Sequence, residues 1–182
     1  MVSKKYHAYL SGGMEYANNE GVDWRNEIEN WIIQKLKHIV FNPNKESQKL
    51  LTKLLPQKNF RELKSTDIDT YINIAKRFID KDSKEIALRS DYIICYWDES
   101  AQRGAGTKGE LTLASYFKKP VYMVTNISRQ QIPGWVLGCV TSTYDSFELL
   151  QVFLMKKYGY KNITSTGKKN DQRKSKIGKG LS

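Results

Sequence analysis

Apolar residues recur along this chain in two patterns, one with the period of strands and one with the period of helices. Short apolar runs bounded by glycine, proline or polar residues predict strands. The predicted strands are Lys5–Leu10, His38–Phe41, Tyr92–Trp97, Pro120–Thr125 and a final short one within Val136–Thr141. Stretches with apolar residues every three or four positions predict helices. These are a helix after Asp23, which would cap it, then Lys45–Leu55, Ile68–Leu88, Thr107–Phe117 and Ser146–Tyr158. The polar segments Gln57–Thr66 and Asp98–Gly106 read as loops.

Strands that alternate with helices indicate a single α/β domain. We expect a mainly parallel, flavodoxin- or Rossmann-like sheet of about five strands, with helices on both faces. In such sheets ligands bind beyond the carboxyl ends of the strands. Three loops therefore become candidates for a site, namely Ser11–Val22, Asn42–Lys45 and Asp98–Thr107.

The charge of the chain is concentrated at its C-terminal end. The 182 residues carry a net charge of +11, and residues 161–182 hold seven Lys or Arg residues against one acid, Asp171, which makes +6 for that segment. We therefore divide the chain into an α/β domain, residues 1–160, and a basic, disordered tail, residues 161–182. The tail either makes weak contacts with the phosphates of a nucleic acid or is a solvated terminus.

Composition narrows the class of protein further. The chain has two cysteines, Cys95 and Cys139, and two histidines, His7 and His38, in no recognisable catalytic or zinc-binding signature. We expect buried free thiols in a reducing compartment and hence a cytoplasmic protein. There is no secretory signal pattern and no apolar run long enough to span a membrane. We expect neither a metal site nor a cofactor.

The segment Ser90–Val124 holds the most informative chemistry. A buried strand ends at Asp98, and a loop leads to Thr107 and, three residues later, Glu110. Thr107-x-x-Glu110 fits a capping box, in which Glu110 only satisfies backbone N–H groups. Alternatively, Glu110 lies in the first helical turn, where the helix dipole keeps it ionised, and shares a crevice with Asp98. Two carboxylates in one crevice suit the cleavage of a glycosidic bond.

The order of these motifs resembles the nucleoside 2-deoxyribosyltransferase family and related nucleotide N-glycosidases. The resemblance rests on Tyr9-Leu10-Ser11-Gly12-Gly13-Met14, on Gly106-Thr107-x-x-Glu110-Leu111 and on Lys119-Pro120-Val121. Trp24-Arg25 and Asn42-Pro43 also fall where relatives carry similar residues, and the similarity covers Lys5–Thr125. The cytokinin-activating phosphoribohydrolases have a similar Gly-Thr-x-x-Glu run, but the opening strand and Asp98 favour the deoxyribosyltransferases.

The resemblance implies a role for each carboxylate. Glu110 would be the nucleophile that forms a ribosyl-enzyme intermediate, Tyr9 would orient it, and Asp98 would hold sugar hydroxyls. A further aspartate would exchange a proton with the base, and Asp82 is favoured over Asp80 for that role. Arg25 or Arg103 would hold a 5′-phosphate if one is bound. The expected substrate contacts are Ser11, Gly12, Gly13, Met14, Arg25, Trp97, Gly106 and Thr107.

These expectations lead to a first hypothesis and leave others open. The first is an enzyme that cleaves or transfers at the N-glycosidic bond of nucleosides or nucleotides. The second is a related phosphoribohydrolase or an NAD-cleaving enzyme. The third is a catalytically silent nucleotide- or nucleic-acid-binding module on the same fold. By resemblance, the chain is expected to form a homo-oligomer.

Overall fold

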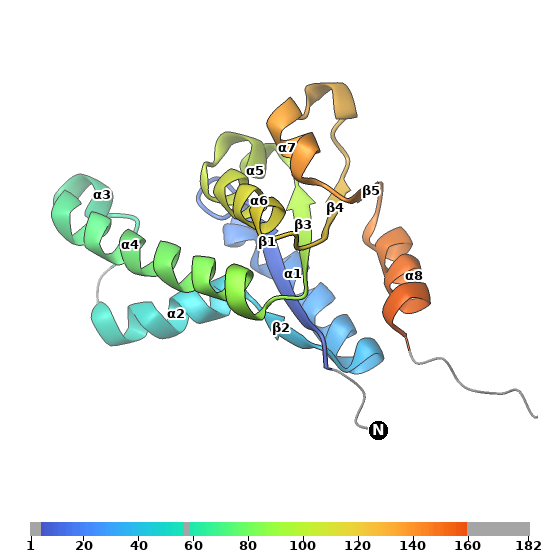
Figure 1. The fold of residues 1–182 in the computed structure, drawn as a ribbon. Coiled ribbons are helices and arrows are strands. Elements are labelled where there is room, and N and C mark those ends of the chain that lie inside the picture. The colour runs from blue at the N-terminus through green and yellow to red at the C-terminus, as the bar shows by residue number, and fades with distance from the viewer. Residues whose placement is uncertain (1–4, 57–58, 160–182) are drawn as a thin grey trace, which may run out of the picture.

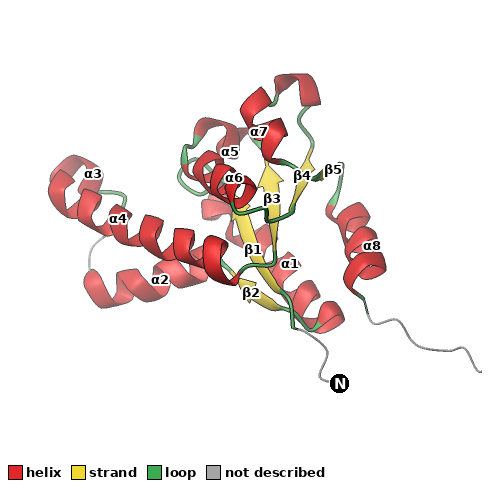
Figure 2. Ribbon diagram, in the orientation of Figure 1, coloured by secondary structure: helices red, strands yellow, loops and turns green. Residues whose placement is uncertain are grey.

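The protein is built around one five-stranded sheet with helices on both faces (Figures 1 and 2). The computed structural model describes residues 5–56 and 59–159. All four strand pairings are parallel, and the strand order is β2-β1-β3-β4-β5. This is the flavodoxin-like order, in which the chain reverses direction across the sheet between β1 and β3. The predicted fold class is therefore confirmed. The expected tail, residues 161–182, lies outside the described residues.

Five strands and the helices between them follow one another along the chain. The strands are β1 (His7–Gly12), β2 (Ile39–Phe41), β3 (Tyr92–Trp97), β4 (Val121–Thr125) and β5 (Ser142–Tyr144). The α-helices are α1 (Val22–Trp31), α2 (Pro43–Leu54), α3 (Leu63–Thr66), α4 (Ile68–Lys84), α5 (Glu99–Arg103), α6 (Gly106–Tyr116), α7 (Gly134–Cys139) and α8 (Phe147–Tyr158). Two 3₁₀ helices are η1 (Asn18–Gly21) and η4 (Arg129–Gln131), and two π-helical segments, η2 (Ile32–Leu36) and η3 (Glu85–Arg89), continue α1 and α4. None of the described helices is long and apolar enough to cross a membrane.

Alternate residues of the central strands enter two separate cores, as the two-residue period of a strand requires. Tyr9, Ile93 and Cys95 face a core shared with α5, α6, α7 and η3. Leu10 and Ile94 face the opposite core, shared with α1, η2 and α8. Because both faces are covered, β3 and β4 are apolar along most of their length, as expected of a parallel sheet.

Helices α2, α3 and α4 form an arm that projects from the sheet (Figure 1). Asn42 caps α2 and Asp67 caps α4, each accepting a hydrogen bond from a backbone N–H of the first turn. The arm has a small core of its own, with Phe60, Leu63 and Ile74 at its centre. Figure 2 shows α2 and α4 running alongside each other away from the sheet. Residues of α2 and α4 also line the cavity described below, so the arm forms one of its walls.

The structure corrects several predicted boundaries. The expected strand within Val136–Thr141 is wrong, because α7 occupies most of it and the strand follows at Ser142–Tyr144. The two predicted loops contain short helices, α3 and α5. Asp23 does not cap α1, whose N-cap is Gly21 in the left-handed conformation, at a φ of 67°. A short run of mixed apolar residues suits a helix turn as well as a strand, so the pattern did not distinguish them.

Candidate active site

The carboxylate of Glu110 is held at both oxygens by side chains of β1. The Tyr9 hydroxyl donates to Oε1 at 2.8 Å, and the Ser11 hydroxyl donates to Oε2 at 2.5 Å. Tyr9 and Ser11 are two positions apart on a strand and therefore point to the same face of the sheet. Both residues are fully buried. The strand thus fixes the carboxylate in a single orientation, and the geometry agrees with the expectation that Tyr9 orients Glu110.

Glu110 does not belong to a capping box. Helix α6 begins at Gly106, its N-cap Ala105 makes no side-chain cap, and its first turn contains no acidic residue. Glu110 therefore lies in the second turn, and both of its oxygens face β1 rather than the start of α6. The expected placement of Glu110 in the first helical turn, at the positive end of the helix dipole, is therefore wrong. Burial raises the pKa of Glu110, while hydrogen bonds from Ser11 and Tyr9 and the charge of Arg25 oppose this rise.

Asp82 on α4 is the second carboxylate of the site. Asp82 and Glu110 line the same cavity. Burial, followed by the nearby charge of Glu110, raises the pKa of Asp82 to about 7. The positive charges of Lys81 and Arg25 and the polar Tyr9 hydroxyl oppose this rise. Asp80, by contrast, forms an exposed ion pair with Lys84 at 2.8 Å. Of the two aspartates considered from the sequence, the fold brings Asp82 to Glu110.

The Tyr9 hydroxyl lies close to both carboxylates. Its ring stacks on Phe41 with centroids 5.3 Å apart, which fixes its position. Burial, followed by the charges of Glu110 and Asp82, raises the pKa of Tyr9 well above its ordinary value. Tyr9 therefore stays a neutral hydrogen-bond donor at physiological pH.

Asp98 has a structural role in this arrangement. Its Oδ1 accepts hydrogen bonds from the backbone N–H of Ala101 at 2.9 Å and from the Ser100 hydroxyl at 2.5 Å, and so caps α5. Asp98 is not among the described residues that line the cavity, although Ser100 is. Of the three carboxylates, the structure therefore places Asp82 and Glu110, and not Asp98, in the lining of the cavity.

Trp97 and Arg25 are also not where a substrate would reach them. Trp97 is fully buried in the sheet core, so the expectation that it faces the crevice is wrong. Arg25 is 1% exposed, and its guanidinium donates to the backbone carbonyls of Leu10, Gly12, Gly13, Glu20 and Gly21. Because these carbonyls occupy its N–H groups, Arg25 shapes the loop after β1. Of the two arginines expected to hold a 5′-phosphate, Arg25 or Arg103, Arg25 is therefore not available for that contact.

The cavity at the carboxyl ends of the strands has a volume of about 850 Å³. The predicted contact residues Gly12, Gly13, Met14, Gly106 and Thr107 line it, together with Gly109. A side chain at Gly13 would come within 1.9 Å of the Ser100 hydroxyl, so the close approach of this loop to α5 requires glycine. By contrast, a Cβ at Gly109 would meet nothing within 4 Å. The backbone beside Glu110 is therefore open to a substrate.

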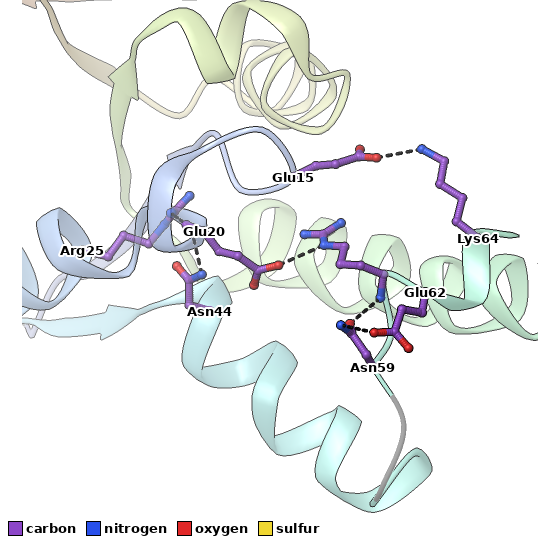
Figure 3. A network of polar contacts seen from close by, with 8 residues as sticks. Glu15, Glu20, Arg25, Asn44, Asn59, Glu62 and Lys64 are labelled. Atoms are coloured by element: carbon purple, nitrogen blue, oxygen red, sulfur yellow. Dashed lines mark hydrogen bonds and ion pairs between the residues drawn. The ribbon is translucent and has the colours of Figure 1, made fainter. Parts of the chain in front are cut away.

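Two ion pairs join the loop after β1 to the segment between α2 and α4 (Figure 3). Lys64 Nζ lies 2.7 Å from a Glu15 oxygen, and Arg61 Nε lies 2.9 Å from a Glu20 oxygen. The Glu20 carbonyl also accepts hydrogen bonds from Asn44 and Arg25. Glu15, Glu20 and Arg61 line the cavity, so these pairs, called the latch below, bridge it. Sequence reasoning missed the latch because its partners lie 41 and 49 positions apart in ordinary charged segments.

Comparison with solved structures identifies the fold. A 2-deoxyribosyltransferase from Bacillus psychrosaccharolyticus has a TM-score of 0.53 and 13% sequence identity, over 85% of this chain and 97% of that one. A 2-deoxyribosyltransferase from Leishmania mexicana has a TM-score of 0.51 and 16% identity, over 83% of this chain and 97% of that one. The chain has the 2-deoxyribosyltransferase fold. No protein-family model and no curated protein sequence matches it. At this level of identity the likeness to the deoxyribosyltransferases concerns the fold alone.

Proposed function

We propose that this chain cleaves the N-glycosidic bond of 2′-deoxynucleosides and transfers the sugar to a second base or to water. The observation that carries the proposal is the Glu110 carboxylate, held by Tyr9 and Ser11 in a cavity that it shares with Asp82. One carboxylate oriented to attack and one that holds a proton near neutral pH are the two groups this reaction needs. The fold likeness to two 2-deoxyribosyltransferases supports the same substrate class.

In the first step, a Glu110 oxygen attacks the anomeric carbon of the sugar while the bond to the base breaks. The bonding electron pair leaves with the base, and the protonated Asp82 carboxyl gives its proton to a nitrogen of that base. The product is a deoxyribosyl ester on Glu110. Two hydrogen bonds to the carboxylate reduce its freedom to rotate, so little entropy is lost on reaching the transition state.

In the second step, an incoming base or a water molecule attacks the same carbon and breaks the ester. Asp82, now ionised, takes the proton that the attacking group loses, and Glu110 leaves as a carboxylate. Because Asp82 has a pKa of about 7, it is suited both to give and to take a proton. Transferase and hydrolase differ only in the group that attacks in this step.

Incubation of the protein with each of the four 2′-deoxynucleosides, with and without a free acceptor base, tests the proposal. Base release and base exchange are followed by liquid chromatography. The expected result is release or exchange that Glu110→Gln abolishes, with Glu99→Gln, an exposed glutamate on α5, as the matched control. Equal release by the wild-type and Glu110→Gln proteins would contradict it.

A further inference from the structure

The cavity extends well beyond the two carboxylates, into the arm. Its far part, called the apolar annex below, is lined by Leu51, Leu55, Phe60, Tyr71, Ala75 and Phe78. The Phe60 ring stacks on Tyr71 with centroids 4.6 Å apart and meets Phe78 edge-on at 5.2 Å. Polar groups reach this region from Ser47, Gln48 and Thr52 on α2 and from Asn59. The α4 residues of the annex are Tyr71, Ala75 and Phe78, which are apolar except for the Tyr71 hydroxyl.

Helix α4 connects the annex to the reacting groups. Asp82, Phe78, Ala75 and Tyr71 all line the cavity, and they recur at spacings of three or four residues along one face of the helix. Tyr71 lies eleven positions before Asp82 on the helix, which at 1.5 Å per residue is about 16.5 Å along its axis. The cavity therefore continues past the proton donor by more than one ring system.

The proposed function sets the direction of the substrate in this cavity. The sugar must lie at Glu110, and the base must lie at Asp82 to exchange a proton with it. A group attached to the far edge of the base then points along α4 into the annex. Arg61, which pairs with Glu20 in the latch, and its neighbour Phe60 both line this part of the cavity. The six residues that define the annex are buried or half-buried.

We infer that the apolar annex is a second subsite, which accepts a ring-sized apolar substituent on the exocyclic amine of the base. This inference rests on the proposed function for the orientation of the substrate. Burial of an apolar ring against Phe60, Tyr71 and Phe78 removes apolar surface from water and brings aromatic rings into contact. The preferred substrates are accordingly nucleosides with an apolar group on the base rather than the unsubstituted ones.

The test uses 2′-deoxyadenosine and 2′-deoxycytidine, each unsubstituted and with a benzyl group on its exocyclic amine. The full-length protein is expected to show a KM at least tenfold lower for at least one benzylated nucleoside than for its parent. Equal or higher KM values for both benzylated compounds, with the parents turned over, would overturn the inference and leave the proposed function standing.

Two variants locate the effect in the annex. Ala75→Trp fills the annex and is expected to reduce the ratio of kcat/KM for benzylated over parent nucleoside at least tenfold. Lys76→Trp places the same side chain at an exposed position of the same helix, outside the cavity lining, and should leave the ratio unchanged. An unchanged ratio in Ala75→Trp would place the benzyl group elsewhere and overturn the inference.

A binding measurement separates the inference from the proposed function. If no nucleoside is cleaved, the proposed function fails. Calorimetric binding of free N6-benzyladenine and of adenine then tests whether the annex binds the apolar substituent. Tighter binding of N6-benzyladenine that Ala75→Trp removes would support the subsite. Equal affinity for the two bases, or a preference that Ala75→Trp leaves unchanged, would overturn it.

Discussion

The Tyr9 hydroxyl donates a 2.8 Å hydrogen bond to a Glu110 oxygen across 101 positions of the sequence. Together with Ser11, it fixes the carboxylate that the proposed reaction uses as its nucleophile. Tyr9→Phe removes this bond and keeps the ring that stacks on Phe41. We expect kcat to fall by about 10- to 100-fold, since one hydrogen bond to a charged group contributes about 1.5–3 kcal/mol. Steady-state kinetics on the best deoxynucleoside measures this, and an unchanged kcat would mean that Tyr9 does not orient Glu110.

Glu110→Ala should abolish base release and leave the protein folded. The loss of a covalent nucleophile costs several orders of magnitude in rate. The effect on stability is moderate, because the unfavourable burial of the carboxylate is removed while the buried Tyr9 and Ser11 hydroxyls lose their acceptor. Turnover and thermal unfolding are measured on the same sample. Near-normal turnover with a lowered Tm would show that Glu110 only supports the fold.

The proposed role of Asp82 predicts a dependence on the leaving group. Asp82→Asn should slow cleavage of 2′-deoxyadenosine by about 100- to 10,000-fold, the usual contribution of general acid–base catalysis. The base of 7-methyl-2′-deoxyguanosine already carries a positive charge and leaves without a proton. Asp82→Asn should therefore slow the first-step release of this base, measured as a pre-steady-state burst, by less than about tenfold, because only the second step then needs the proton transfer to Asp82. Equal losses on both substrates would assign Asp82 a different role.

The pKa of Asp82 also predicts a pH dependence of stability. The pKa of Asp82 is about 7 in the folded protein, against an ordinary pKa of 3.8. Between pH 3.8 and pH 7 the folded protein therefore binds a proton that the unfolded chain does not. The contribution of this group to stability therefore falls as the pH rises through this window. Asp82→Asn, which imitates the protonated form, should gain stability over the wild-type protein between pH 5 and pH 8, as urea unfolding measures. A difference in unfolding free energy that is independent of pH would contradict the assignment.

Arg25 should act on stability rather than on substrate choice. Its guanidinium donates to five backbone carbonyls around the loop after β1. This loop contains three consecutive residues with positive φ, Asn19 to Gly21. Arg25→Met leaves these carbonyls without their partner and should cost about 3 kcal/mol or more of unfolding free energy. Urea unfolding measures the loss. A normal unfolding curve with a raised KM for 5′-phosphorylated substrates alone would restore the phosphate-binding role.

The sequence alone predicted the features of the fold that depend on local pattern. The buried strands at Tyr92–Trp97 and Pro120–Thr125 and the long helix from Ile68 follow from apolar periodicity, and the ligand crevice follows from the parallel topology. The side-chain directions within that crevice did not follow. A displacement of one residue turns a helical side chain by about 100°, so spacing alone could not choose between Asp80 and Asp82.

The functions of Arg25, Asp98 and the latch depend on contacts between distant segments. Nothing local distinguishes an arginine that binds phosphate from one that is surrounded by carbonyls, because both follow a glycine-rich turn. Likewise, Asp98 at a strand end suited either a sugar contact or a helix cap, and the structure places it as the cap of α5. These assignments required the three-dimensional arrangement.

The most direct test of the central claim is a search for the ester on Glu110. A 2′-deoxy-2′-fluoronucleoside of the preferred base destabilises the oxocarbenium-like transition states of both steps, as it does in retaining glycosidases, and allows the intermediate to accumulate. Intact-mass spectrometry of the protein after incubation should show one added fluorodeoxyribosyl group, and peptide mapping should place it on Glu110. Base release without any adduct, or an adduct on a residue other than Glu110, would contradict the account.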